Sequence, residues 1–325
     1  MGQHHLEGEN TPFGRFFLPG PTEVRPEVLK AQTRAMIGHR GSLIQEFVSE
    51  LQQGLKKVFV TDRPVFISSS SASGLMEAAV RNGASGKVLS LVNGAFSHRF
   101  GDIARACALE VDEVAVPWGE AHDPAVVASA LAAGAYHAVT VVHSETSTGV
   151  LNDLPAISSV VAQHADTLLL VDSVTGCGGA ELLTDAWALD FVLTGSQKAL
   201  ALPPGLSFAV ASEAMMERSA SITGKGQYFD LVAFAKNLEK FQTPTTPALS
   251  TMYALQVQLA RIADETIEGR WARHSAMAER THAWVDGMRA DGVQLQVMAP
   301  VGHRSPTVTA VSLPESLSGP NVVRA

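Results

Sequence analysis

The sequence predicts an α/β protein, with a large domain built on a mostly parallel β-sheet and a smaller domain after it. From about residue 65 to residue 212, short apolar runs rich in β-branched residues alternate with alanine-rich helical runs, which is the pattern of a sheet covered by helices. The chain is 46% hydrophobic and 17% charged, as folded globular proteins are. Its 325 residues are too many for one compact core, so we expect two domains.

The elements follow in order along the chain. The segments expected to form strands are 65–69, 87–94, 137–146, 167–174, 190–198 and 206–212, and helical runs follow the first three at 74–83, 98–107 and 154–165. A long helical run from about Thr251 to Met288 is expected to bridge two domains, and the β-rich segments 293–298 and 307–313 predict a smaller sheet. We therefore expect an N-terminal arm at 1–15, a large domain at 16–264 and a small α+β domain at 265–325.

Charge and cysteine content narrow the class of function. The net charge of -8 argues against nucleic acid and anionic membranes as partners, because those interfaces are built on clustered basic residues. The N-terminus is polar, no apolar run is long enough to span a membrane, and the two cysteines form no CxxC metal motif. The sequence therefore predicts a cytoplasmic protein that acts on small molecules and holds no metal.

A single lysine follows the strand expected at 190–198, in the stretch "FVLTGSQKALALPPG". Lys198 comes three residues after Gly195, among small neighbours. One interpretation is a lysine that extends its ammonium to the surface. The other is a desolvated amine with a lowered pKa, which can attack a carbonyl carbon to form a Schiff base. The stretch by itself leaves both interpretations open.

An aspartate ends the preceding expected strand, in "LLLVDSVTG". Asp172 follows four apolar residues, at the sheet edge where ligands of open α/β proteins bind. A buried carboxylate is costly unless a cation or a donor meets it, and a protonated pyridine nitrogen is one such partner. The alternative is an aspartate that only caps the following turn.

Other polar and aromatic residues follow neighbouring strands. Ser71 and Ser73 precede a helix, so their hydroxyls and the helix N–H groups form an anion site suited to a phosphate, or simply an N-cap. Phe96 in "VNGAFSHRF" suits stacking on a planar heterocycle, or packing in the core. Thr146 in "HSETSTG" offers a hydroxyl at another strand end. A parallel sheet would bring all of these to one edge, and together with Lys198 and Asp172 they describe a site for pyridoxal 5'-phosphate.

These motifs resemble those of the class V aminotransferases, which have fold type I. "VDSVTGCGG" followed by "GSQKALALPPG" is specific to that group, and "FFLPGPTEVRPEVL", "SASGLMEAAV", "NGAFSHRF", "HSETSTGVL" and "TPTTPALS" match in order. The resemblance covers residues 16 to 325 and is to the alanine–glyoxylate and serine–pyruvate (serine–glyoxylate) aminotransferases. It implies a large domain with a mostly parallel seven-stranded sheet and a smaller C-terminal α+β domain that is incomplete.

The resemblance implies roles at the reacting end of the cofactor. Lys198 resembles the Schiff-base lysine that also carries the proton, and Asp172 resembles the residue that keeps the pyridine nitrogen protonated. Phe96 takes the ring-stacking place, and Thr146 takes the place of the hydroxyl residue near the ring's 3-oxygen. Pro19 and Gly20 belong to the "PGP" segment that helps to form the substrate pocket.

The resemblance also implies how the phosphate and the subunits are arranged. The phosphate cradle corresponds to Ser71, Ala72 and Ser73, with Gln197 nearby. Thr245 matches a threonine that reaches the phosphate of the neighbouring subunit, which implies a homodimer with shared active sites, and segment 38–41 matches one near the dimer interface. The arginine that binds the substrate carboxylate in the family is expected beyond Ala325, in a segment that follows the one containing Arg304.

The implied activity is pyridoxal phosphate-dependent transamination between alanine or serine and glyoxylate or pyruvate. A 2-aminoethylphosphonate–pyruvate aminotransferase remains an alternative, because donor choice depends on pocket side chains that the sequence does not place. A cysteine desulfurase-like enzyme is a second alternative, although it expects a histidine before the lysine and a mobile cysteine, where this chain has Gln197 and Cys177. A non-catalytic protein that binds pyridoxal phosphate is the third.

Overall fold

The computed structural model describes residues 18–314, 316, 317 and 319, and its main feature is a seven-stranded sheet in the order β1-β9-β8-β7-β4-β2-β3. Its strands are β1 (Val65–Ser68), β2 (Val88–Val92), β3 (Val111–Ala115), β4 (Ala138–Val142), β7 (Leu168–Asp172), β8 (Phe191–Gly195) and β9 (Ser207–Ala211). Strand β9 runs antiparallel to both of its neighbours, and the other paired strands are parallel. The predicted α/β class and the mostly parallel seven-stranded sheet are confirmed.

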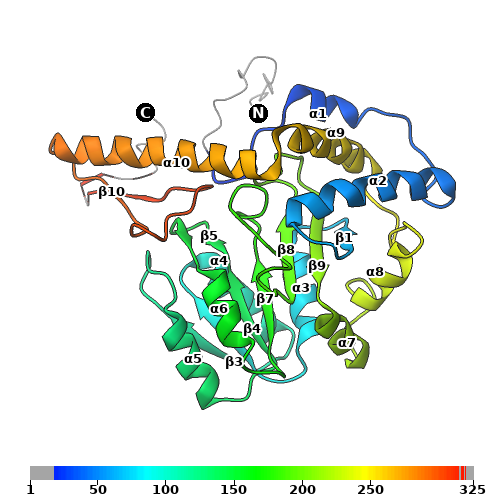
Figure 1. The fold of residues 1–325 in the computed structure, drawn as a ribbon, viewed down its shortest axis with the longest axis horizontal. Helices are drawn as coiled ribbons and strands as arrows, with labels where there is room; N and C mark the ends of the chain where they lie inside the picture. The colour runs from blue at the N-terminus through cyan, green and yellow to red at the C-terminus, as the bar shows by residue number, and fades with distance from the viewer. Residues whose placement is uncertain (1–17, 315, 318, 320–325) are drawn as a thin grey trace, which may run out of the picture.

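Helices cover both faces of this sheet (Figure 1). One face packs against α2 (Ser42–Phe59), α5 (Pro124–Ala133), α6 (Leu154–Val161) and α9 (Leu249–Glu265), and the other against α3 (Ala72–Gly83), α4 (Ala95–Ala106), α7 (Glu213–Ser221) and α8 (Leu231–Leu238). Strand side chains alternate between the two cores: Val192 belongs to the first, whereas Phe191 and Leu193 belong to the second. Because both faces are buried, the strands in the middle of the sheet are mostly apolar instead of alternating with polar residues.

The long helical run expected from Thr251 to Met288 is two helices and not one. Helix α9 ends at Glu265, and α10 (Ile267–Ala290) begins after Thr266. Thr266 has a φ of 62° and its side chain accepts a hydrogen bond from the Gly269 N–H, so it caps α10. A threonine side chain that caps a helix start is a common way to break a helical run, and its single positive φ changes the direction of the chain.

Short strands complete the fold. The expected segments 293–298 and 307–313 pair as β10 (Gln296–Val297) and β11 (Val311–Ser312) next to α10, while β5 (Ser144–Glu145) pairs with β6 (Val150–Leu151). The sequence analysis did not find β3, an edge strand of sequence VDEVA whose residues are half-buried or exposed. Helix α1 (Pro26–Ala31) precedes α2, and α10 lies along the end of the molecule near β5 (Figure 1).

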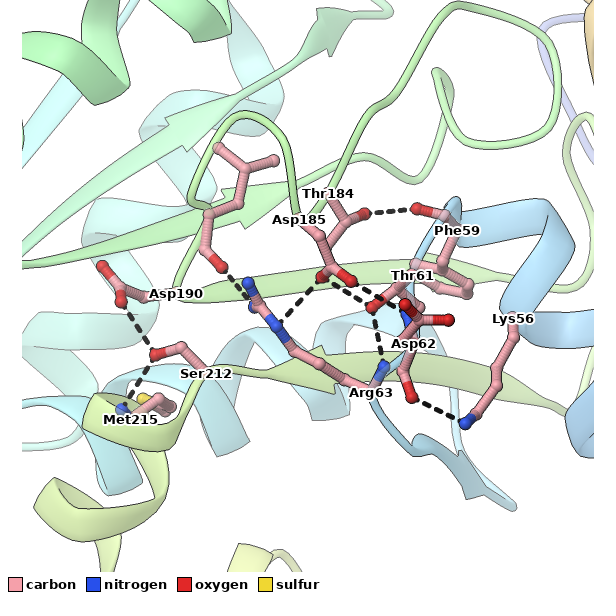
Figure 2. A network of polar contacts seen from close by, with 11 residues as sticks. Lys56, Phe59, Thr61, Asp62, Arg63, Thr184, Asp185, Asp190, Ser212 and Met215 are labelled. Carbon is pink, nitrogen blue, oxygen red and sulfur yellow. Dashed lines mark hydrogen bonds and ion pairs between the residues drawn. The ribbon is translucent and has the colours of Figure 1, made fainter.

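A polar network fixes the connection into β8 at the end opposite to Lys198 (Figure 2). Asp185 accepts a hydrogen bond from the Thr61 hydroxyl at 2.7 Å and pairs with Arg63 at 3.0 Å. Arg63 also donates to the Leu189 carbonyl at 2.7 Å, and the Thr184 hydroxyl donates to the Phe59 carbonyl at 2.6 Å. The network joins the segment before β1 to the segment before β8.

A search of the described residues finds no helix that combines the length and the apolar character needed to cross a lipid bilayer.

Candidate active site

The residues singled out in the sequence follow strands that end at one edge of the sheet. Strand β1 is antiparallel to β9, and β9 is antiparallel to β8, so β1 points the same way as β8, β7, β4 and β2. Ser71, Phe96, Thr146, Asp172 and Lys198 follow or end these five strands. The structure therefore brings them to the edge where open α/β sheets bind ligands.

Lys198 is half-buried, and its amine donates a hydrogen bond to the Pro19 carbonyl. Burial lowers the pKa of the amine, and the charge of Asp172 opposes that shift. Gly20 lies against the lysine: its φ is +132°, and a Cβ there would come within 2.6 Å of Lys198 Cδ. Thr22 holds the same loop, donating from its hydroxyl to the Lys198 carbonyl at 3.0 Å. The "PGP" segment thus borders the lysine.

Asp172 lies at the end of β7 with 2% of its surface exposed. Burial raises the pKa of its carboxyl group to about 7, while the Val174 N–H, at 2.8 Å from Oδ1, and the cations Lys198 and Arg99 act in the opposite direction. Within the described part of the chain, that N–H is the hydrogen-bond donor recorded for this carboxylate. A buried carboxylate with so few donors fits a cationic partner such as a protonated pyridine nitrogen.

Phe96 is the second residue of α4, and its ring is half-buried. The Lys198 amine lies 6.0 Å from the ring centroid and the Arg99 guanidinium 4.9 Å from it. A ring in this position, next to the lysine and at the sheet edge, suits stacking on a flat heterocycle.

Glu145 holds Phe96 in place, a role that the sequence analysis did not identify. Its carboxylate is fully buried and accepts hydrogen bonds from the N–H groups of Phe96 and Ser97, at 3.2 and 2.9 Å, and from the Ser147 hydroxyl at 2.7 Å. It also lies next to Thr146 in the chain. One carboxylate therefore ties the helix that carries the aromatic ring to the loop that carries the threonine. No sequence signal marks this role, because the donors come from a segment about fifty residues away.

Replacing Glu145 by glutamine is expected to weaken cofactor binding and to destabilise the protein by about 1–3 kcal/mol, because an amide NH₂ would face N–H donors. Urea unfolding and a binding titration with pyridoxal phosphate measure the two effects. Glu77→Gln is the matched control: Glu77 forms a half-exposed ion pair with Arg81 one helical turn away, which contributes about 0.2–0.5 kcal/mol. Equal losses in the two variants would refute the positioning role of Glu145.

The predicted phosphate cradle lies at the start of α3. Ser71 is the N-cap residue, and its side chain makes no capping hydrogen bond, while Ala72 and Ser73 form the first turn. The first N–H groups of a helix have no partner within the helix, so they are available to an anion. Gln197 lies beside this turn, because a Cβ on Gly195 would come within 2.6 Å of Gln197 Oε1 and 3.4 Å of the Ala72 Cβ. These residues fit a phosphate group.

The two threonines predicted for the site, Thr146 and Thr245, lie in loops that contact other loops of the protein. The Thr146 hydroxyl forms a hydrogen bond with the Thr175 hydroxyl at 2.6 Å, which connects the loop after β5 with the loop after β7. Thr245 is exposed, and Arg40 donates to the neighbouring Thr243 carbonyl at 2.9 Å. The structure thus joins segment 38–41 to the loop that carries Thr245, the two places expected near a subunit interface.

A cavity of about 560 Å³ borders Lys198. Its lining includes Thr22, Ala199, Gln258, Arg270 and His274. Burial lowers the pKa of His274 to about 4, which keeps the imidazole neutral at physiological pH. Arg304 lines a different cavity, together with Trp118 and Met298, so the structure does not place its guanidinium beside the lysine.

A buried aspartate at the end of β7 and a half-buried lysine after β8, with an aromatic ring and a helix N-terminus at the same edge, are features of pyridoxal phosphate-dependent enzymes of fold type I. The family model described as aminotransferase class-V matches residues 27–316. The chain belongs to the class V aminotransferases, and its cofactor is pyridoxal phosphate.

Sequence and structure comparisons with individual proteins support this family assignment. An uncharacterized aminotransferase of Methanocaldococcus jannaschii is 39% identical over 305 residues, covering 92% of this chain and 78% of the relative. The serine–glyoxylate aminotransferase of Arabidopsis thaliana is 31% identical over 334 residues, covering 99% and 79%. The crystal structure of alanine–glyoxylate aminotransferase from Nostoc sp. superposes with a TM-score of 0.87 at 29% identity, covering 94% of this chain and 81% of that one. The expected enzyme class and fold are therefore confirmed.

Proposed function

We propose that this aminotransferase moves the amino group of a small amino acid, alanine or serine, to a small 2-oxo acid, glyoxylate or pyruvate. The observation that carries the proposal is the Lys198 amine, which is half-buried, lies 6.0 Å from the Phe96 ring centroid and follows β8, the strand paired with the one that ends at Asp172. The names of the Arabidopsis and Nostoc relatives, with serine or alanine and glyoxylate, support the substrate class.

Each site residue has a role that its surroundings support. When bound, pyridoxal phosphate supplies the electron sink for the α-carbon of the substrate. Lys198 Nζ removes the proton from that α-carbon, because burial favours the neutral amine. The charge of Asp172 would hold a proton on the pyridine nitrogen, and the Phe96 side chain would stack on the ring and exclude water from it.

The remaining residues orient the reactants. The N–H groups of Ala72 and Ser73, with the Ser71 and Gln197 side chains, bind the phosphate. The Thr146 hydroxyl, already paired with Thr175, donates toward the ring's 3-oxygen. Pro19 and Gly20 line the substrate side of Lys198, because their backbone lies in contact with its side chain.

We propose further that the enzyme is a homodimer in which Thr245 completes the phosphate site of the other subunit. Its exposure and the Arg40 contacts beneath its loop support this arrangement. In a mixed dimer of one Lys198→Ala chain and one Thr245→Ala chain, we expect one intact site and about half of the native turnover, as one of two sites is complete. If Thr245 served its own subunit, the site that keeps its lysine would lack the threonine, and the mixed dimer would bind cofactor weakly.

The structure argues against a cysteine desulfurase-like function. Cys177 is fully buried, and burial raises the pKa of its thiol to about 12. The reactive form of a cysteine is the thiolate, so this side chain is not available as a nucleophile. Gln197 occupies the position before the lysine, where that class expects a histidine.

We also propose the domain boundary 264/265 and a cytoplasmic location, while the expected arm at 1–15 and its boundary 15/16 lie outside the described residues. Thr266, between α9 and α10, supports the 264/265 boundary, as does a separate apolar cluster around Val285, Leu295 and Val297. Cys107 and Cys177 are both free thiols, which fits a reducing compartment.

A half-reaction screen tests the substrate proposal. Purified enzyme with bound cofactor is mixed with alanine, serine, aspartate or 2-aminoethylphosphonate, and the conversion of the cofactor to its amine form is followed by absorbance. We expect alanine or serine to convert it fastest. Conversion by 2-aminoethylphosphonate alone would replace the proposal with the phosphonate alternative, and the absence of conversion by every donor would overturn it.

A further inference from the structure

Arg270, in the first turn of α10, joins two loops of the site. Its side chain is buried, with 7% of the residue exposed. The guanidinium donates from Nε to the Gly178 carbonyl at 2.9 Å and from Nη2 to the Ala199 carbonyl, and Nη1 pairs with Glu265 at 2.9 Å. Each of its three nitrogen atoms therefore has a partner.

The two carbonyl groups belong to the loops that carry the proposed catalytic residues. Ala199 directly follows Lys198, and Gly178 lies in the loop that follows Asp172 and β7. The Asp172 loop is folded on itself, since the Cys177 N–H donates to the Ser173 carbonyl at 2.8 Å. The loops also touch, because a Cβ on Gly179 would come within 3.1 Å of the Ala199 Cβ. Arg270 thus fixes the distance between two loops that are already in contact.

Stability alone does not account for an arginine in this place. A cation in the first turn of a helix opposes the helix dipole, and a buried ion pair contributes little net stability compared with apolar residues of similar volume. Glu265 also pairs with Arg273, with an oxygen–nitrogen distance of 3.2 Å to Nη2. Its charge would therefore still be neutralised if Arg270 were absent. What Arg270 adds is the fork of donors that reaches both carbonyls, a geometry that lysine does not reproduce.

We propose that Arg270 is a positioning residue that holds the Lys198 and Asp172 loops in register, so that the amine and the carboxylate meet the same cofactor ring from fixed directions. The proposal rests on the proposed function, since it uses the roles assigned there to Lys198 and Asp172. Through Arg270, helix α10, which lies beyond the proposed domain boundary, contacts the loops that carry the reacting groups.

The test compares cofactor affinity in Arg270→Gln and Arg270→Lys with that in Arg273→Gln. Arg273 pairs with the same glutamate from the same helix, its side chain is 45% exposed, and its recorded contacts are with Glu265, which makes it the matched control. Dissociation constants are measured for pyridoxal phosphate and for pyridoxamine phosphate, which has no aldehyde for the lysine and so reports the non-covalent contacts, that of Asp172 among them, without the Schiff base.

We expect both Arg270 variants to bind pyridoxal phosphate about tenfold or more weakly than the native protein, because a hydrogen bond from a charged group is lost. Their affinity for pyridoxamine phosphate should fall by a smaller factor. Turnover should fall about 100-fold with little change in KM, the effect of a displaced reacting group. Arg273→Gln should match the native protein. Native affinity for either ligand in Arg270→Lys, or equal losses in Arg270→Gln and Arg273→Gln, would overturn the proposal.

Far-ultraviolet circular dichroism and urea midpoints check that each variant is folded. If Arg270→Gln does not fold, Arg270→Lys, which keeps the positive charge, still allows the test. A variant with a lower urea midpoint but native affinity for both ligands would show a purely structural role. The affinity measurements require no substrate. If the native enzyme binds the cofactor but converts none of the tested amino acids, the proposed substrate assignment fails, and the Arg270 test can still be carried out.

Discussion

Replacing Lys198 by alanine is expected to abolish both the visible absorbance of the lysine-linked cofactor and turnover. The variant has no amine to bond to the cofactor aldehyde and none to move the α-proton, and general acid–base catalysis alone contributes about 10²–10⁴-fold. Absorbance spectra of the reconstituted protein and a coupled assay of 2-oxo acid formation measure the two losses. A small amine added to the assay should restore part of the turnover but not the covalent link.

The fold should survive the change. The Lys198 side chain is half-buried and its main partner is the Pro19 carbonyl, so the urea midpoint should stay close to that of the native protein. A Lys198→Ala variant that keeps both the absorbance and the activity would refute the assignment of this residue, and with it the roles proposed for its neighbours.

Replacing Asp172 by asparagine is expected to lower turnover about 10²–10³-fold, the typical cost of losing one preorganised electrostatic contact at a reacting group. Asparagine has nearly the same shape but carries no charge to keep the pyridine nitrogen protonated. Steady-state rates measure the loss. A variant with native turnover would show that the buried carboxylate has no electrostatic role.

The same residue makes the stability of the cofactor-free protein depend on pH. The folded-state pKa of Asp172 is raised by burial to about 7, above its value in the unfolded chain, so the folded state binds the proton more tightly. Its contribution to stability is fully present below about pH 4 and is lost as the pH rises through about 7. The groups whose charges act on it are Glu145, which raises the pKa further, and Lys198 and Arg99, which lower it.

Urea unfolding at pH 5 and pH 8 checks this sign. Without cofactor, the native protein should lose about 2 kcal/mol relative to Asp172→Asn between the two pH values. With cofactor bound, the positive pyridine nitrogen favours the carboxylate, so the difference should disappear. A native protein that gains stability relative to the variant as the pH rises would contradict the buried, proton-retaining carboxylate.

Much of the fold and of the site could be predicted from the sequence because both depend on local patterns. Continuous apolar runs indicate strands buried on both faces, and the residue types after them, such as Asp172 after four apolar residues, belong to a few chemical classes. The break at Thr266 could not be predicted, because one positive φ inside a helical pattern leaves no periodic signal. Strand β3 was missed because an edge strand is only partly buried and lacks an apolar run.

Local sequence patterns were enough to predict the α/β class, the aminotransferase family and the identities of the residues at the strand ends. Only the tertiary structure decided that Glu145 binds the helix of Phe96, that Gly20 lies against Lys198 and that Arg270 joins the Asp172 and Lys198 loops. The physical reason is that these contacts join residues from about fifty to nearly two hundred positions apart. A hydrogen bond between such residues depends on how the chain packs, and the local sequence around either partner carries no trace of it.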